Sequence, residues 1–243
     1  MDVDSRDMRT PLVEQAANLC DRRHITEAIA LLRTVLVEDP HDLDALGVLG
    51  DAQLADHDPD GALATATIAI ELDPERDLPH RQASIAASRR GLHREAIAHA
   101  EKAIRLAPDD HRGFVALARA LLRAKRHLEQ ARHVAVRAIV LAHDEAEPHL
   151  VFGMVSRAEG EDAAAEAAFC RVLELDPGNM AALNELARLK LRRAVLGLRA
   201  TPAESAGSAP TQSTDERIAV SRRTLDHVAR SFLARVSRSR MTA

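Results

Sequence analysis

The stretch FGMVSRAEGEDAAAEAAFCRVLELDP, residues 152–177, decides the fold of this 243-residue chain. Prolines recur ahead of its final proline at intervals of 34 residues, at Pro40, Pro74 and Pro108, and His143 fills the remaining slot. A repeat of this length is typical of a solenoid that is built from one helical hairpin per repeat. The sequence therefore predicts an array of hairpins in which each unit contacts only its neighbours.

The composition supports an all-α fold. Hydrophobic residues make up 46% of the chain but aromatic residues only 2%, and Trp and Tyr are absent. Ala and Leu must therefore fill the interior, and both are strong helix formers. Small side chains also let neighbouring helices pack closely.

A common register follows when the proline slot is counted as position 32 of a 34-residue unit. The units are then 9–42, 43–76, 77–110, 111–145 and 146–179. Position 20, near the start of each second helix, holds a small residue: Ala28, Ala62, Ala96 and Ala165, with Ala131 one place late. The late alanine places an extra residue between Lys125 and Gln130, in or beside a turn, where solenoids tolerate insertions.

Two glycines mark the turn within a unit. Gly91 and Gly160 both fall at position 15, between the two expected helices. Turns at this place often need a positive φ, which glycine adopts at no steric cost. Position 8 of the first helix is also small, with Gly153 as the example in the fifth unit.

The chain resembles the tetratricopeptide repeat (TPR) family over residues 9–193. The fifth unit carries the resemblance best, through Phe152, Gly153, Gly160, Ala165, Phe169 and the closing Leu-Asp-Pro at 175–177. The resemblance implies a right-handed superhelical solenoid whose first helices line a concave groove, and a role in protein–protein interaction. This chain departs from the family in having no Trp at position 4 and no aromatic residue at position 11.

Segments outside the five repeats complete the expected organisation. Residues 1–8 form a polar N-terminal tail, and residues 180–193 repeat the first-helix pattern and are expected to be a capping helix with one polar face. We expect a flexible linker at 194–214, because 201–214 contains no Leu, Ile, Val or aromatic residue. Residues 215–243 are a basic amphipathic helix or a disordered tail.

The charge is distributed unevenly. Residues 215–243 hold seven Arg against three acidic residues, a net +4, and Glu204 lies in the linker; the formal charge of −4 leaves −7 for residues 1–200. An acidic body without aromatic residues lacks the usual features of nucleic-acid binding. Cys20 and Cys170 match no metal or redox spacing, and no long apolar stretch occurs, so we expect a cytoplasmic protein.

No motif for chemistry appears. The sequence contains no phosphate-binding loop, nucleophile elbow, zinc signature or dinucleotide fingerprint. Histidines such as His93 and His99 are six apart, which places them on different faces of one helix. We expect no enzyme, no cofactor and no metal site.

The candidate binding residues follow from the resemblance, which implies that positions 2, 5, 6, 9, 12 and 13 face the groove. These positions are acidic in the first two units: Glu14, Asp21, Asp44 and Asp51. They are basic in the later units: Arg81, Arg89, Arg112, Arg119, Arg123 and Arg157. Nearby apolar residues are expected to serve as anchors: Ile85, Val115, Leu122, Leu150, Val151 and Met154.

The prediction is a non-enzymatic adaptor or scaffold that binds an acidic or amphipathic segment of a protein partner in the groove. Arginines can form charge-assisted, often bidentate, hydrogen bonds to carboxylates. The opposing interpretation is that these arginines are solvated or paired with neighbouring acidic residues. Two further alternatives involve the tail: it occupies the groove and regulates it, or it anchors a peripheral membrane scaffold.

Overall fold

The computed structural model describes residues 4–125 and 127–199, and all secondary structure in these residues is α-helical. The prediction of an all-helical array of hairpins is confirmed. The chain divides into two compact units, residues 1–126 and 127–243. The boundary falls in the turn of the fourth expected repeat, where the sequence register shifts by one residue.

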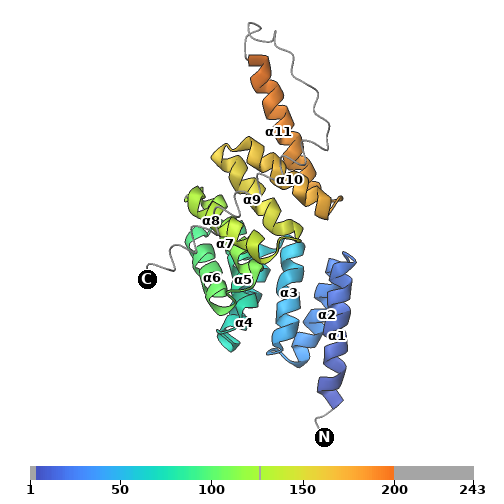
Figure 1. Cartoon of the computed structure of the whole chain (residues 1–243). Coiled ribbons are helices and arrows are strands. Elements are labelled where there is room, and N and C mark those ends of the chain that lie inside the picture. Colours follow the sequence, from blue (N-terminus) through green and yellow to red (C-terminus); the bar gives the residue numbers. More distant parts are fainter. Residues whose placement is uncertain (1–3, 126, 200–243) are drawn as a thin grey trace, which may run out of the picture. The chain divides into compact units, whose positions relative to one another are not determined.

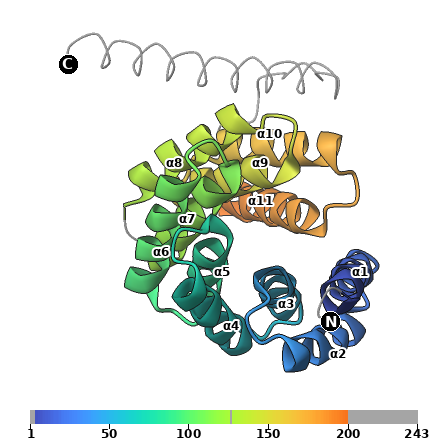
Figure 2. The same ribbon diagram turned by 90° about the horizontal axis from the view of Figure 1, so that it is seen from below.

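The first unit contains seven helices among its described residues (Figure 1). They are α1 (Asp4–Asp21), α2 (Ile25–Glu38), α3 (Leu43–Ala55), α4 (Pro59–Leu72), α5 (Asp77–Arg89), α6 (His93–Leu106) and α7 (His111–Ala124). The first helices of the repeats, α1, α3, α5 and α7, pack side by side in one layer, and α2, α4 and α6 form the other layer (Figure 2). The candidate residues Arg81 to Arg123 all lie in the first layer.

The second unit contains α8 (Leu128–Leu141), α9 (Ala146–Glu159), α10 (Asp162–Leu175) and α11 (Met180–Arg199) within its described residues. Helix α9 packs against α8 and α10, and α11 packs against α10 and α9. Arg157 belongs to this unit. The linker is expected at 194–214 and the tail at 215–243; residues 200–243 lie outside the described residues, as do the alternatives that depend on the tail.

Both terminal helices are longer than the expected boundaries. Helix α1 begins at Asp4, so residues 4–8 are helical and not a polar extension; the acidic Asp4 and Asp7 are typical of a helix start. Helix α11 continues to Arg199, beyond the expected end of the capping helix at Arg193. Residues 194–199 read AVLGLR; Ala194, Leu196 and Leu198 are good helix formers, and the helix continues past Gly197.

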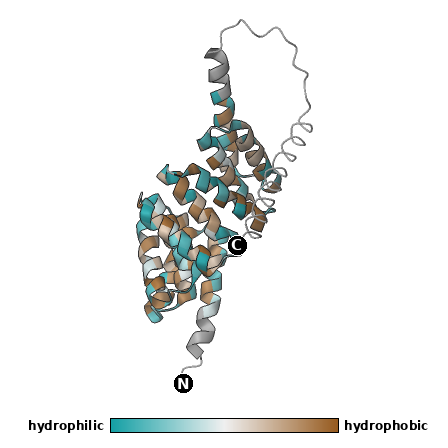
Figure 3. Cartoon of the chain, turned by 60° about the vertical axis from the view of Figure 1, so that its left-hand side comes forward, coloured by the Kyte–Doolittle hydropathy of each residue, from teal (hydrophilic) through white to brown (hydrophobic). Residues whose placement is uncertain are grey.

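The register predicted from the prolines matches the packing. The five alanines of position 20 have no exposed surface: Ala28, Ala62, Ala96, Ala131 and Ala165. Hydrophobic and hydrophilic residues both occur on every helix of Figure 3, as expected for helices that bury one face. Small buried residues let the two helices of a hairpin approach closely.

The turn within each hairpin uses a left-handed residue at position 15. Gly91 has φ 78° and Gly160 has φ 85°, as the sequence predicted. The three repeats without glycine adopt the same conformation at Arg23, His57 and Lys125, with φ of 64°, 62° and 52°. The extra residue of the fourth repeat lies in the turn and not in α7: Lys125 keeps position 15, His127 is a second left-handed residue with φ 55°, and α8 begins one place later than the other second helices.

Candidate partner-binding surface

Three arginines of the first unit form a cluster on neighbouring helices. Arg89 ends α5, and Arg119 and Arg123 are one turn apart on α7, which packs against α5. Burial lowers the pKa of the Arg89 guanidinium, and the positive charges of Arg123 and Arg119 lower it further. The three side chains therefore lie close enough for their charges to interact, and we call Arg89, Arg119 and Arg123 the arginine cluster.

The cluster is held in place by the backbone of the preceding repeat. Arg89 donates a hydrogen bond from Nη1 to the carbonyl oxygen of Leu54, at the C-terminal end of α3. A cation at this end of a helix is favourable because the last carbonyls have no partner within the helix. Within residues 4–125 and 127–199, neither Arg89 nor Arg123 pairs with a carboxylate.

Arg81 lies on the same face of α5, two turns before Arg89. Its Nε is buried and has no hydrogen-bond partner in the described part of the chain. Ile85 lies between these two arginines on the helix, and it is half-buried, as is Leu122 beside Arg123. The face thus combines positive charge with partly accessible apolar surface.

Arg112 lies on α7 as well but is bound to its own helix cap. Its Nε is 3.0 Å from each carboxylate oxygen of Asp110, and its Nη2 is 2.9 Å from Asp110 Oδ2. Burial alone would raise the pKa of the Asp110 carboxyl, but the side-chain and backbone hydrogen bonds from Arg112 outweigh it and lower that pKa. This contact fixes the start of α7 and already supplies Arg112 with a carboxylate.

Arg157 has a carboxylate partner in the second unit. Its Nε lies 2.8 Å from Oε2 of Glu185 on α11, and Arg188 Nη1 lies 2.9 Å from the other oxygen of Glu185. Glu185 is only 7% exposed. The pair therefore ties α9 to α11, which is a structural role that spacing in the sequence could not reveal.

Half of the expected apolar anchors belong to the core. Val115, Leu150 and Val151 are buried, with exposed fractions of 4%, 8% and 0%. The expectation that they offer contacts to a partner is wrong, because each packs inside its own unit. Ile85, Leu122 and Met154 are the three that stay half-buried.

The acidic residues of the first two repeats have different surroundings. Asp44 accepts a hydrogen bond of 2.9 Å from Arg76. Burial raises the pKa of the Cys20 thiol, and the nearby charges of Asp21 and Asp51 raise it further, so these two acids lie near each other. Both carboxylates are exposed.

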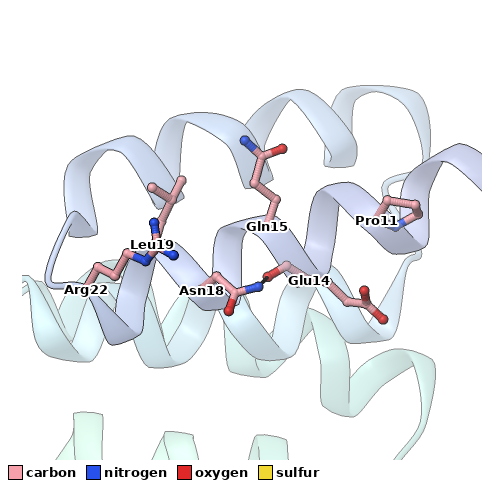
Figure 4. A pocket seen from close by; sticks show the side chains of 6 residues that line it. All are labelled: Pro11, Glu14, Gln15, Asn18, Leu19 and Arg22. Carbon is pink, nitrogen blue, oxygen red and sulfur yellow. Dashed lines mark hydrogen bonds between the residues drawn. The ribbon is translucent and has the colours of Figure 1, made fainter.

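Glu14 lies on an open face of α1 (Figure 4). This face is lined by Pro11, Glu14, Gln15, Asn18 and Leu19 of α1 and by Arg22 directly after the helix. Asn18 Nδ2 donates a 2.9 Å hydrogen bond to the Glu14 carbonyl oxygen. These six residues do not form a recognisable catalytic or metal-binding arrangement.

A histidine contact escaped the sequence analysis because its members are 19 residues apart. His80 Nδ1 lies 3.1 Å from His99 Nδ1, and His80 Nε2 lies 3.1 Å from the Pro74 carbonyl oxygen. His149 repeats the second contact, with Nε2 2.9 Å from the His143 carbonyl oxygen. His80 and His149 both occupy position 4 of their repeats, and each contacts the carbonyl oxygen of position 32 in the preceding repeat. The 34-residue register is therefore the feature of the sequence from which both contacts could have been found.

These histidines stabilise the junctions between repeats as neutral groups. Burial lowers the pKa of His80, His99 and His149. In residues 4–125 and 127–199, no three His, Cys, Asp or Glu side chains come together as metal ligands. In the same part of the chain, no helix has both the length and the apolar character that a membrane span requires.

The comparisons with known proteins agree with the fold. Residues 14–77 match a tetratricopeptide repeat family. No curated protein matches the chain. A thermophilic TPR protein of Thermus thermophilus, TTC0263, is 18% identical with a TM-score of 0.69, over 75% of this chain and 99% of its own.

Two further solved structures share the architecture. PilF of Pseudomonas aeruginosa is 18% identical with a TM-score of 0.60, over 84% of this chain and 96% of its own. YrrB, described as a TPR protein with an unusual peptide-binding site, is 15% identical with a TM-score of 0.50, over 73% and 91% of the two chains. At these identities the likeness concerns the fold alone. The match over residues 14–77, the 34-residue register and the hairpin fold of the described residues agree with a tetratricopeptide repeat fold.

Proposed function

We propose that this protein is a non-enzymatic adaptor that binds an acidic or amphipathic segment of a partner protein on the exposed face of α5 and α7. The arginine cluster carries this proposal. Three positive charges lie together, and two of them have no carboxylate partner in the described part of the chain.

The cluster differs from the charge-paired arginines of the described residues. Four arginines elsewhere are each paired with one acidic residue: Arg76 with Asp44, Arg90 with Asp60, Arg132 with Glu159 and Arg192 with Asp162. The interpretation of a simply solvated, charge-paired surface therefore fits those positions and not the cluster. Like charges held near one another gain more from an incoming anion than isolated ones.

The surroundings of the cluster favour a peptide over a free anion. Ile85 and Leu122 are half-buried beside the arginines, so a bound segment could place an apolar side chain on them. Planar guanidinium groups bind carboxylates in a bidentate manner, which fixes orientation as well as charge. Arg81, with its buried Nε, extends the same face along α5.

The test compares two charge reversals on the full-length protein. Arg119→Glu with Arg123→Glu alters the cluster, and Arg94→Glu is the control, because Arg94 is exposed on α6 in the other layer. A fluorescein-labelled peptide of glutamates and leucines serves as the probe in anisotropy titrations at low and moderate salt. We expect the double variant to lose binding at least about tenfold, and the control to keep it, because reversal replaces attraction by repulsion.

The salt dependence gives a second readout. Binding by the unaltered protein should weaken with rising salt, since partly exposed charges are screened. Equal affinity of the double variant and the Arg94→Glu control for the probe would refute the assignment of the surface. Affinity purification from native cells with both variants then identifies which natural partners depend on the cluster.

A further inference from the structure

Helix α11 exposes an apolar stripe. Met180 is 64% exposed, Leu183 41% and Leu191 66%, and Ala187 between them is exposed as well. These residues follow one another at helical spacing. The opposite side of α11, with Ala182 and Leu189, is buried in the second unit. The expected polar face of a capping helix is therefore absent over this stripe.

The stripe coincides with the surface that a first helix normally gives to its own second helix. Leu183 and Ala187 stand at positions 4 and 8 of a sixth unit that begins at Met180. In the fifth repeat, position 8 is Gly153 and position 24 is Phe169. A Cβ added to Gly153 would lie 2.6 Å from the Phe169 ring. Position 8 thus touches position 24 across the hairpin, and α11 has no such partner among the described residues.

Second helices of this protein share three buried positions, 20, 24 and 27. In every repeat these residues are at most 2% exposed: Ala28, Leu32 and Val35; Ala62, Ala66 and Ala69; Ala96, Ala100 and Ala103; Ala131, Ala135 and Ala138; Ala165, Phe169 and Val172. The sequence near the end of the chain has the same spacing and the same residue types in Ala229, Leu233 and Val236. Arg235 before the last of these matches Arg171 in the fifth repeat.

We propose that residues 225–239 are the second helix of a sixth hairpin, separated from its first helix by a long connection, and that they cover the stripe on α11. Because the two helices of a hairpin are antiparallel, the alignment places Leu233 over Ala187, Val236 near Leu183 and Ala229 near Leu191. The connecting residues 200–224 have the reach required, because about 25 residues of coil span roughly 25–30 Å, and the 20 residues of α11 extend about 30 Å.

The charges on α11 permit this arrangement although the segment is basic. Arg188 is paired with Glu185 and Arg192 with Asp162, each at 2.9 Å. Glu185 is shared with Arg157, so the carboxylates offset part of this positive charge and reduce the repulsion that the arginines of the segment would meet. The site on α11 is separate from the arginine cluster, so this inference is independent of the proposed function.

Disulfide trapping in the full-length chain tests the docking. Cys20→Ser and Cys170→Ser first remove the native thiols, which are both free. Ala187→Cys with Leu233→Cys is the test pair, and Ala181→Cys with Leu233→Cys is the control, because Ala181 is exposed away from the stripe. After mild oxidation of dilute protein, we expect about tenfold more intrachain crosslink in the test pair, since docking raises the effective concentration of the two thiols.

A second comparison separates docking from general damage. Ala229→Glu places a charge at the buried position 20, while Ala234→Glu places it at position 25, which is exposed at Arg33, Thr67 and Glu101. Hydrogen exchange of the α11 amides should rise in Ala229→Glu and stay unchanged in Ala234→Glu. Equal crosslinking of both cysteine pairs, crosslinks only between chains, or equal exchange in the two glutamate variants would each overturn the proposal.

Discussion

Substituting Gly153→Ala tests the packing of the hairpins at its tightest point. Gly153 lies inside α9, and a Cβ there would lie 2.6 Å from Phe169 Cε1, 2.9 Å from Cδ1 and 3.0 Å from Cζ. Phe169 has no exposed surface, so its ring has no free space to enter. The added methyl group therefore forces either the ring or the helix to shift.

Two opposing effects decide the size of the change in the free energy of unfolding. Overpacking of a filled core costs about 1–3 kcal/mol. Replacing glycine by alanine within a helix gains about 1 kcal/mol. We expect a net loss of up to about 2 kcal/mol, and each kcal/mol lowers the Tm of a chain of this size by roughly 2–4 °C.

Urea unfolding followed by circular dichroism measures the change, and a double-mutant cycle assigns it to the ring. In a Phe169→Leu background the methyl group has room, so Gly153→Ala should no longer destabilise and should recover part of its helix propensity. A gain in stability from Gly153→Ala in the unaltered chain, or the same loss in both backgrounds, would refute the argument that position 8 contacts position 24.

Three further outcomes follow from contacts described above. Because the fold lowers the pKa of His80 and His149 below the ordinary value of about 6.5, protonation favours the unfolded chain: stability is full above about pH 6.5 and declines as the pH falls through the lowered pKa values. The fall in unfolding free energy between pH 7.5 and 5 should be smaller in His80→Gln, and an identical fall would contradict this role. Gly91→Ala should destabilise by roughly 1 kcal/mol because alanine disfavours φ 78°, whereas His57→Gly should be neutral or stabilising in the same thermal melts. Asp42 accepts from the backbone N–H groups of two α3 residues, so Asp42→Ala should cost about 1 kcal/mol and Asp42→Asn much less, as denaturant midpoints would show.

The register carried most of the predictable information. Proline spacing and the small residues of position 20 predicted the hairpins, and the buried Ala28 to Ala165 confirm that assignment. The glycines of position 15 predicted left-handed turns, although Arg23, His57 and Lys125 show that the fold imposes this conformation without glycine. Local sequence patterns suffice here because each hairpin is held by contacts of short range.

The partners of individual charged side chains could not be predicted. Arg157 and Arg89 stand at neighbouring groove positions of their repeats, but one meets Glu185 of α11 and the other the Leu54 carbonyl. These contacts join residues 28 and 35 positions apart and depend on side-chain rotamers across a repeat junction. The grouping of Arg89 with Arg119 and Arg123 likewise needed the packing of α5 against α7.

The left-handed residue in every hairpin also bears on how the array opens. A side chain in this conformation costs on the order of 1 kcal/mol relative to glycine, and the first two hairpins carry Arg23 and His57 there while the third carries Gly91. In a linear array, each hairpin is stabilised by itself and by its neighbours. Hydrogen exchange should therefore find the lowest opening free energies at the α1–α2 and α3–α4 hairpins and rising protection toward α5–α6, so that the first unit loosens from its N-terminal side.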